Sequence, residues 1–366
     1  MKIHAAILTQ PNRPFIIEQP DLEDPCPGEV LVRIAATGVC HSDWHLASGA
    51  TQHPMPVVAG HEGAGVVQAL GPGVRGIKTG DHVVLNWAPA CGSCFYCHHN
   101  QPNLCQTYLD PIWAGTMLDG STRLKWNGKP LYHWCGLAAF AQYTVVPQQS
   151  CVVIRPDVPL NVAALVGCAI ATGVGAVIYT ANVRPAQSVA VFGCGGVGLS
   201  ILQGAALAGA GDIIAVDTNP AKANLARQFG ATHFLQANDD TVDLIRELTA
   251  GRGADHAFEA VGLPHVQETA FAAVRPGGTL TLAGLSRMGS ATNLPGSIIA
   301  RQEKTIKGSY YGSVNPPRDF PMLLDLYMAG KLKLDEMVSH QWTLDQINQA
   351  FAQMLTGDVA RGLIVF

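Results

Sequence analysis

The sequence decides its fold at Ser188-Val-Ala-Val-Phe-Gly-Cys-Gly-Gly-Val-Gly198, where an apolar run passes directly into closely spaced glycines. The apolar run has the length of a buried strand, and the small residues after the glycines favour a helix that packs closely on a sheet. A second apolar run, Asp212-Ile-Ile-Ala-Val-Asp217, follows that helix and ends in a carboxylate. This order predicts two neighbouring parallel strands joined by a helix.

Strands and helices continue to alternate further along the chain. Apolar runs predict strands at residues 254–260 and 278–284, and helices are predicted near residues 220–229, 241–249 and 265–274. This alternation is typical of a doubly wound parallel sheet with helices on both faces, the Rossmann arrangement. The fold class predicted for this part of the chain is therefore α/β.

The glycine-rich turn predicts a dinucleotide-binding site formed by Gly193, Gly195, Gly196, Val197 and Gly198. Glycines let the backbone approach a pyrophosphate at a helix N-terminus, where unpaired N–H groups favour an anion. Asp217 at the end of the next strand would accept hydrogen bonds from the adenosine ribose and repel a 2′-phosphate. We therefore expect NAD rather than NADP, with Lys222 as a neighbour. A glycine-rich turn without a ligand is the alternative interpretation.

Residues 1–90 show a different pattern, in which short β-branched runs are separated by Gly and Pro. The runs are Glu29-Val-Leu-Val-Arg-Ile-Ala35, Gly65-Val-Val-Gln-Ala-Leu-Gly71 and Asp81-His-Val-Val-Leu85. Such runs predict a small, strongly bent β barrel rather than helices. Residues 106–135 are rich in Gly, Asp and Asn, and predict a long loop that borders a site.

Length and composition restrict the class of protein. A chain of 366 residues exceeds the usual size of a single core, so two domains are expected. A net charge of −4 with only 14% charged residues argues against a nucleic-acid partner. Residues 162–181 carry no charge, but glycines interrupt them, which favours a buried helix over a membrane span. Without a signal-peptide pattern at Met1, cytoplasmic residence is expected.

Four cysteines form the strongest metal motif, at Cys91, Cys94, Cys97 and Cys105. Four thiolates on one short lobe make the closed tetrahedral shell of a structural zinc ion, with no open position for a substrate. An iron–sulfur cluster is the alternative, although its usual cysteine spacings fit less well. Ten cysteines in all are too unevenly placed for a disulfide framework, and Cys26, Cys135, Cys151 and Cys194 are interpreted as ordinary buried thiols.

A second metal site is indicated by Val39-Cys-His-Ser-Asp-Trp-His45 and Gly60-His-Glu-Gly-Ala-Gly65. Cys40 and His61 offer ligand types that zinc selects, and Cys168 would add a third ligand while leaving a fourth position open. An open position is expected of a catalytic zinc ion. Spacing alone does not place Cys168 beside the other two residues.

Gly60-His-Glu-Gly-Ala-Gly65, followed by Gly71 and Val74, resembles the signature of the zinc-containing alcohol dehydrogenases of the medium-chain dehydrogenase/reductase superfamily. The similarity extends over essentially the whole chain and points to the longer branch that includes the liver-type and class III enzymes. It implies a GroES-like β-barrel catalytic domain at residues 1–170 and 311–366, and a Rossmann coenzyme domain at residues 171–310.

The resemblance also implies roles for individual residues. At a catalytic zinc ion these are the ligands Cys40, His61 and Cys168, the carboxylate Glu62 behind the metal, and Asp43 as the partner of His61. For proton relay and cofactor they are Ser42 and His45 as the relay, Thr172 beside the nicotinamide, and His41 with Arg361 at the pyrophosphate. With the cysteine lobe, the implied cofactors are NAD and two zinc ions per chain.

The activity implied is reversible oxidation of a primary alcohol to its aldehyde by hydride transfer to NAD. The substrate-pocket positions of the family fall on Ser42, Trp87, Trp134 and Cys135. The indoles of Trp87 and Trp134 favour an aromatic or unsaturated alcohol. The alternative is that these two side chains simply pack in the core. A homodimer is expected, and a tetramer is the alternative.

Two other functions stay open. A thiol-dependent formaldehyde dehydrogenase is disfavoured, because Thr51, His53 and Leu109 replace the two acids and the arginine of the glutathione enzymes. A non-catalytic NAD- and zinc-binding protein is the other, although every candidate ligand is retained in this sequence.

Overall fold

The computed structural model describes residues 1–357 and 360–366. Contacts divide the chain into two compact units. The N-terminal unit comprises Met1–Cys168 and Asn315–Phe366, and the central unit comprises Ala169–Val314. The predicted domains change at residues 170 and 311, whereas the compact units change at residues 168 and 315.

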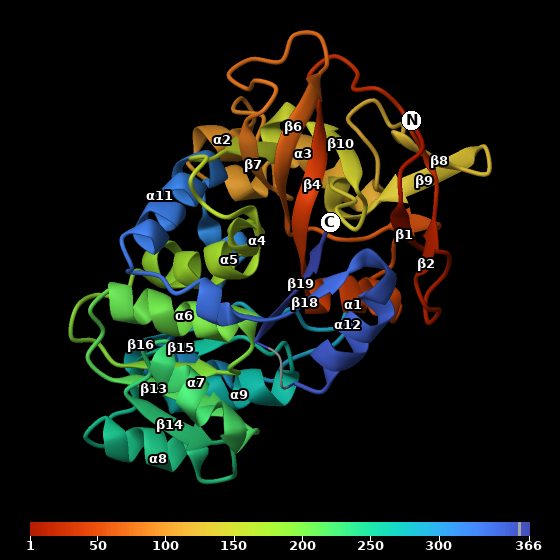
Figure 1. Cartoon of the computed structure of the whole chain (residues 1–366). Helices are drawn as coiled ribbons and strands as arrows, with labels where there is room; N and C mark the ends of the chain where they lie inside the picture. The colour runs from red at the N-terminus through yellow and green to blue at the C-terminus, as the bar shows by residue number, and fades with distance from the viewer. Residues whose placement is uncertain (358–359) are drawn as a thin grey trace. The chain divides into compact units, whose positions relative to one another are not determined.

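The central unit is built on a six-stranded sheet with the order β14-β13-β12-β15-β16-β17 (Figure 1). Every neighbouring pair of strands is parallel. The strands are β12 (Val189–Phe192), β13 (Ile213–Asp217), β14 (His233–Gln236), β15 (Ala254–Glu259), β16 (Val274–Leu282) and β17 (Thr305–Gly308). The order runs outward in both directions from β12 and β15, so the predicted doubly wound parallel sheet is confirmed.

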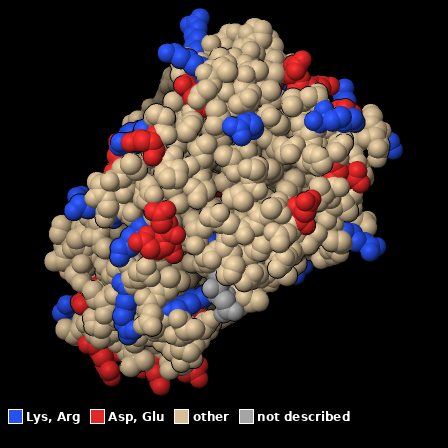
Figure 2. All heavy atoms as spheres, in the orientation of Figure 1, with Lys and Arg blue, Asp and Glu red and all other residues tan. Residues whose placement is uncertain are grey.

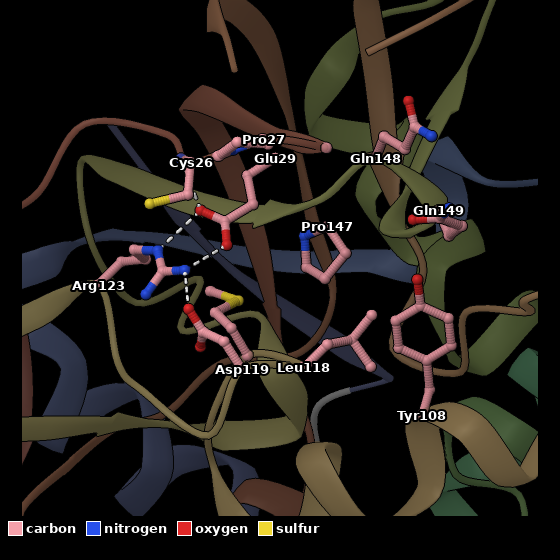
Figure 3. A pocket seen from close by; sticks show the side chains of 12 residues that line it. Cys26, Pro27, Glu29, Tyr108, Leu118, Asp119, Arg123, Pro147, Gln148 and Gln149 are labelled. Atoms are coloured by element: carbon pink, nitrogen blue, oxygen red, sulfur yellow. Dashed lines mark hydrogen bonds and ion pairs between the residues drawn. The ribbon is translucent and has the colours of Figure 1, made fainter. Parts of the chain in front are cut away.

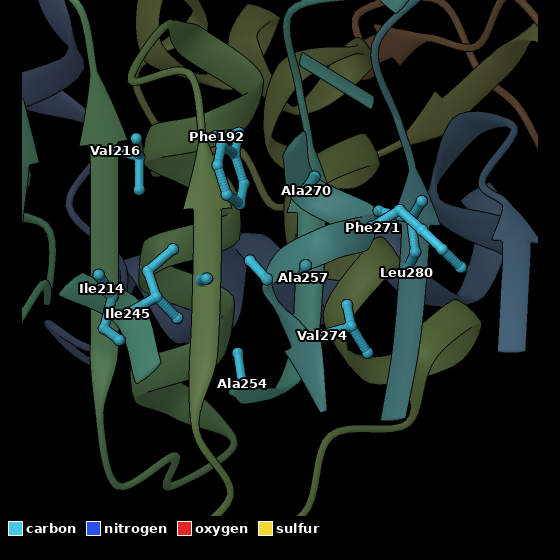
Figure 4. Packing of buried hydrophobic residues seen from close by; sticks show 12 residues of the cluster. Phe192, Ile214, Val216, Ile245, Ala254, Ala257, Ala270, Phe271, Val274 and Leu280 are labelled. Carbon is cyan, nitrogen blue, oxygen red and sulfur yellow. The ribbon is translucent and has the colours of Figure 1, made fainter. Parts of the chain in front are cut away.

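Helices of the central unit alternate with its strands, and the helices predicted after the glycine turn and near residues 220–229, 241–249 and 265–274 are present. They are α5 (Ala169–Gly175), α6 (Gly196–Leu207), α7 (Ala223–Gln228), α8 (Thr241–Leu248), α9 (Pro264–Ala273) and α10 (Gly296–Arg301). A buried cluster fixes α8 and α9 to the sheet, with Phe192, Ile214 and Leu280 from strands meeting Ile245 and Phe271 from these helices (Figure 4). Each large apolar side chain buried in this way stabilises the unit by about 1.5–3 kcal/mol.

The N-terminal unit contains two sheets of mainly antiparallel strands. One has the order β2-β1-β5-β9-β8-β3, and the other has the order β11-β7-β6-β4-β19-β18, with β10 also paired to β4. The strands are β1 (Ala5–Leu8), β2 (Ile16–Glu18), β3 (Asp21–Leu22), β4 (Glu29–Val39), β5 (Val57–Val58), β6 (Gly63–Leu70), β7 (His82–Leu85), β8 (Leu124–Trp126), β9 (Lys129–His133), β10 (Tyr143–Pro147), β11 (Cys151–Val153), β18 (Val338–Thr343) and β19 (Arg361–Val365).

Strand β4 organises the larger of these two sheets. It pairs with β6, β10 and β19, and its register with β6 shifts twice, which bends the sheet as the sequence predicts. Because β19 is the last strand of the chain, its pairing with β4 joins a late segment to an early one (Figure 1). It brings Arg361, the first residue of β19, beside the end of β4. Helices α11 (Pro316–Met328) and α12 (Ile347–Leu355) also belong to this unit.

Two elements of the N-terminal unit differ from the sequence prediction. Helix α1 (His41–Ala47) interrupts a region that was predicted to contain only strands. Residues 106–135 are not a long loop, since they contain α3 (Gln106–Ala114), β8 and β9. Pro111 lies inside α3 and hides its helical pattern, while Tyr108 and Ile112 are buried on one face and Gly115 ends the helix with a φ of 68°.

The predicted helix at residues 162–181 is not continuous. The chain forms α4 (Leu160–Ala163), a 3₁₀ turn (Ala164–Gly167), α5, and a π-helical segment (Ala176–Ala181), with a break at Cys168. Among the described residues, no single helix has the length and apolarity needed to cross a membrane.

Figure 2 shows one face of the molecule, on which Lys and Arg side chains are interspersed with Asp and Glu.

Candidate functional site

Helix α1 and the turn before β6 together fix one imidazole. Asp43 is fully buried, and its Oδ1 accepts hydrogen bonds at 3.0 Å from the backbone N–H of Gly60 and from Nδ1 of His61. Because a carboxylate only accepts, Nδ1 of His61 carries the proton and Nε2 presents its lone pair. A metal-binding histidine requires this arrangement.

That lone pair belongs to a compact buried cluster. One ligand atom each from Cys40, His61, Glu62 and Cys168 lies within 4.8 Å of the others. Cys40 ends the extended segment before α1, and Cys168 sits at the break after the 3₁₀ turn. The tertiary structure therefore brings Cys168 close to Cys40 and His61. Spacing in the sequence indicated only that Cys40 and His61 could lie close to each other.

The chemistry of this cluster fits zinc. A hydrogen bond with Cys168 lowers the pKa of Cys40 well below its ordinary value, although burial opposes the change. Two thiols and a neutral imidazole that converge in a buried site are the donors that zinc prefers. Cys40, His61 and Cys168 are thus suited to hold a zinc ion, with Glu62 as a further oxygen donor.

Glu62 is held by an arginine from the far end of the chain. Arg361, the first residue of β19, forms an ion pair with the Glu62 carboxylate, and both side chains are buried. Burial raises the pKa of Glu62 to about 7, although Arg361 favours the ionised form. A Cβ atom at Gly38 would overlap Oε2 of Glu62, so Gly38 leaves the space that this carboxylate occupies.

The four-cysteine lobe forms a second cluster. The sulfur atoms of Cys94 and Cys97 are 3.6 Å apart, Cys94 and Cys105 are 3.8 Å apart, and Cys91 and Cys97 are 4.0 Å apart. These distances exclude disulfides and match the separation of ~3.8 Å between thiolates around a tetrahedral zinc ion with bonds of ~2.3 Å. Hydrogen bonds, chiefly from the Thr107 side chain, lower the pKa of Cys91 to about 5, which favours its thiolate.

The glycine-rich turn lies between β12 and α6 in the central unit. Gly193 has a φ of +96°, and a Cβ atom there would lie 2.5 Å from the Val261 side chain. No heavy atom lies within 4 Å of the corresponding position at Gly195, among the described residues. A Cβ at Gly198 would overlap the carbonyl oxygen of Gly193, so α6 packs directly against the turn. The turn therefore leaves open space at Gly195, its exposed residue, next to a helix N-terminus of the kind that binds a pyrophosphate.

Asp217 lies at the end of β13, where it meets this turn. Its Oδ2 accepts a hydrogen bond of 2.7 Å from the backbone N–H of Cys194, and Nζ of Lys222 lies 3.2 Å away. The predicted carboxylate, its lysine neighbour and the glycine turn thus occupy one edge of the sheet. Thr172 is buried on α5 in the same unit, and its hydroxyl has no hydrogen-bond partner within the described chain.

Comparison with known proteins identifies the family. Residues 26–156 match the model of the alcohol dehydrogenase GroES-like domain, and residues 196–329 match that of the zinc-binding dehydrogenases. The chain is 40% identical to the NDMA-dependent alcohol dehydrogenase of Amycolatopsis methanolica, over 100% of this chain and 99% of that protein. The chain belongs to the zinc-containing alcohol dehydrogenase family. The predicted family and fold class are thereby confirmed.

Other members of the family are similarly related. The chain is 40% identical to an S-(hydroxymethyl)glutathione dehydrogenase of Escherichia coli, over the full length of both. The crystal structure of benzyl alcohol dehydrogenase from Acinetobacter calcoaceticus matches with a TM-score of 0.94 and 32% identity, covering 100% of this chain and 99% of that one. An alcohol dehydrogenase zinc-binding domain protein from Burkholderia ambifaria matches with a TM-score of 0.95 and 36% identity, at the same coverage.

The residues that the family resemblance assigns to the relay lie together on α1. Oγ of Ser42 is 3.8 Å from Sγ of Cys40, which places this hydroxyl at the metal cluster. His45 is half-buried in the last turn of the helix, and His41 is exposed at its first residue. Ser42 and His45 are three residues apart and hence on one side of the helix.

Three of the four family pocket positions, Trp87, Trp134 and Cys135, are buried, and Ser42 is half-buried. Trp134 is 2% exposed and Trp87 is 9% exposed. Cys135 has a φ of 52°, and burial raises its pKa to about 12. Trp134 contacts the rings of His53 and Trp113 edge-on, with centroids 5.2 and 5.7 Å away. Sequence reasoning missed this ring cluster, because Trp113 was assigned to a loop and His53 was considered only as a replaced acid.

A separate pocket of about 270 Å³ lies in the N-terminal unit and contains none of the predicted site residues (Figure 3). Arg123 donates hydrogen bonds of 2.6 and 2.8 Å to Glu29 and one of 2.8 Å to Asp119. Since the guanidinium is satisfied by these carboxylates, we interpret it as a structural group. Cys26 lines this pocket and is half-buried, so its prediction as a buried thiol is wrong.

Replacing Asp43 with alanine is expected to weaken zinc binding at the buried cluster by about 10–100-fold, because His61 loses the group that orients it. Competition of the protein against a metal chelator measures this change. Asp345→Ala, which removes an exposed carboxylate of the same unit, serves as the control. Equal zinc affinity in both variants would contradict the role of Asp43.

Proposed function

We propose that this protein is a zinc-dependent, NAD-linked alcohol dehydrogenase that interconverts a primary alcohol and its aldehyde. The observation that carries the proposal is the buried convergence of Cys40, His61 and Cys168 beside Glu62. Three protein ligands with a further position are the arrangement of catalytic rather than structural zinc sites. Membership of the family supports the same activity.

A zinc ion bound there would act as a Lewis acid that makes a substrate hydroxyl more acidic near neutral pH. Asp43 keeps the proton of His61 on Nδ1, so that Nε2 stays available as a ligand. Oγ of Ser42, next to Cys40, is placed to accept the proton that the substrate loses. His45 on the same helix would pass this proton to solvent, since an imidazole ring can accept a proton on one nitrogen and donate one from the other.

Glu62 is proposed to serve as an alternative oxygen ligand, with its carboxylate held by the ion pair with Arg361. The space at Gly38 accommodates the carboxylate in this position. His41, Thr172 and Arg361 are proposed to contact NAD, as the resemblance implies. The four cysteines of the lobe are proposed to hold a second, structural zinc ion, which gives two zinc ions per chain.

The substrate is proposed to be an aromatic or unsaturated primary alcohol. As the resemblance implies, Trp87, Trp134 and Cys135 would supply a flat apolar boundary for the substrate. A benzyl alcohol dehydrogenase is among the similar solved structures. Activity on S-(hydroxymethyl)glutathione is the second candidate, because one relative at 40% identity carries that name. His53, packed against Trp134, stands where those enzymes place an acid, and this disfavours the second candidate.

Two measurements on the purified protein test the proposed function. Zinc content is expected to approach two ions per chain, and NADH absorbance should rise with NAD and benzyl alcohol faster than with NAD and ethanol. Formaldehyde turnover that strictly requires glutathione would instead support the second candidate. A protein that binds NADH but turns over no alcohol would be the non-catalytic relative.

We also propose a cytoplasmic homodimer, with a tetramer as the alternative. The ten cysteines are all unpaired, which suits a reducing compartment. Mass photometry of the purified protein measures the number of chains.

Replacing Asp217 with serine is expected to lower the preference for NAD over NADP by about 100-fold. The change removes a carboxylate that would accept ribose hydrogen bonds and repel a 2′-phosphate, and each effect contributes about 1–2 kcal/mol. Ratios of kcat/KM for NAD and NADP measure it. Asp212→Ser at the start of the same apolar run is the control, and an unchanged ratio in Asp217→Ser would contradict the assignment.

A further inference from the structure

A carboxylate at the end of β15 is fully buried and was assigned no role from the sequence. Glu259 is 0% exposed, and its Oε1 accepts hydrogen bonds of 2.6 Å from the backbone N–H groups of both Val261 and Gly262. Its Oε2 accepts a bond of 3.3 Å from the side-chain amide of Gln267. The carboxylate thus fixes the first turn after the strand.

The backbone of the same residue ties three strand ends together. Glu259 is in register with Phe192, the last residue of β12. Its carbonyl oxygen accepts hydrogen bonds of 2.9 and 2.8 Å from Ala283 and Gly284, which follow β16. The turn that Glu259 holds therefore lies at the carboxyl ends of β12, β15 and β16.

This turn lies next to the point at which the strand order of the sheet reverses. Strands β13 and β14 lie on one side of β12, and β15, β16 and β17 lie on the other. In doubly wound sheets a dinucleotide lies across this reversal, with one half on each side. Asp217 ends β13 and marks the adenosine side, so the turn after β15 lies on the nicotinamide side.

The turn after β15 is in direct contact with the glycine-rich turn at Gly193. The Val261 side chain lies 2.5 Å from the Cβ position of Gly193, so Val261 packs directly on the glycine-rich turn. Glu259 sets the backbone of Val261 through one hydrogen bond. The turn after β15 therefore adjoins the glycine-rich turn on the side of β12 opposite to β13.

We propose that Glu259 is a positioning residue for the nicotinamide half of NAD, acting through the Val261–Gly262 turn. The proposal rests on the NAD-linked activity proposed above. A purely structural carboxylate would affect the stability of the fold and both halves of the cofactor alike. A positioning residue should affect the nicotinamide half selectively.

The test compares the binding of NADH with that of ADP-ribose, which lacks nicotinamide. Glu259→Ala is expected to raise the Kd for NADH by about tenfold, while the Kd for ADP-ribose stays within about threefold of wild type. Glu259→Gln retains one acceptor oxygen and is expected to give a smaller rise for NADH alone. It also carries the test if the alanine variant does not fold.

Asp255→Ala is the matched control, because Asp255 is a carboxylate on the same strand at its opposite end. Asp255 accepts hydrogen bonds from Ser188 and Arg275, and its loss should leave the ratio of the two Kd values unchanged. Equal changes for NADH and ADP-ribose in the Glu259 variants, or no change for either, would overturn the proposal. A wild-type protein that binds neither ligand would refute the proposed function as well.

Discussion

Replacing Cys168 with alanine is expected to reduce the zinc content from two ions to one and to lower turnover by at least about 1,000-fold. The variant keeps Cys40 and His61, but two ligands with an adjacent carboxylate hold zinc weakly and in altered geometry. Loss of the Lewis acid removes several kcal/mol of stabilisation from the transition state. Metal analysis by mass spectrometry and steady-state kinetics with benzyl alcohol measure the two effects.

Cys151→Ala is the matched control for this variant. Cys151 is also a buried thiol of the N-terminal unit. It is the first residue of β11, where it lies opposite Leu85 of β7, and it belongs to neither metal cluster. It should retain two zinc ions and full turnover. Binding of NADH to Cys168→Ala should stay within about threefold of wild type, because the glycine-rich turn is untouched. Two zinc ions in active Cys168→Ala would refute the proposed metal centre.

Replacing Cys97 with alanine is expected to remove the other zinc ion and to lower the melting temperature by about 10 °C or more. The lobe at residues 91–105 contains only the short helix α2 (Phe95–His98) and one 3₁₀ turn, so little apolar burial stabilises it. Metal binding in such a segment contributes directly to the free energy of folding. Calorimetry and metal analysis of the same preparation measure both changes.

His98→Ala provides the control, since His98 neighbours Cys97 on α2 but is exposed and lies outside the cysteine cluster. This variant should keep two zinc ions and the wild-type melting temperature. If Cys97→Ala loses no zinc, the lobe does not hold a metal ion through four thiolates. An iron–sulfur cluster would instead appear as visible absorbance and iron in the wild-type protein.

Much of the central unit could be predicted from the sequence, because its signals are local. A strand, a glycine turn and a helix follow one another within residues 188–207, and each is specified by short-range hydrophobic pattern and backbone freedom. The same reasoning failed where local signals conflict. Helix α3 carries an internal proline, and α1 has only seven residues with no apolar period.

The N-terminal unit was predicted less completely. The predicted runs correspond to β4, β6 and β7, but the pairing of β19 with β4 joins segments from opposite ends of the chain. No local pattern specifies such a pairing, because it depends on which exposed strand edge remains available after the rest of the sheet forms. The ion pair of Arg361 with Glu62 follows from this pairing and was not predicted.

The sequence by itself determined the features whose residues lie close together along the chain. These are the glycine turn with Asp217, the four-cysteine lobe, and the proximity of Cys40 to His61. Only the tertiary structure decided that Cys168 joins Cys40 and His61, and that Arg361 pairs with Glu62. It also decided that Glu259 fixes the Val261–Gly262 turn, which packs on Gly193. The physical reason is the separation along the chain between the residues in contact. Backbone geometry and residue spacing specify which residues meet when they lie a few turns apart, whereas contacts between distant segments depend on how the sheets close and bury their faces.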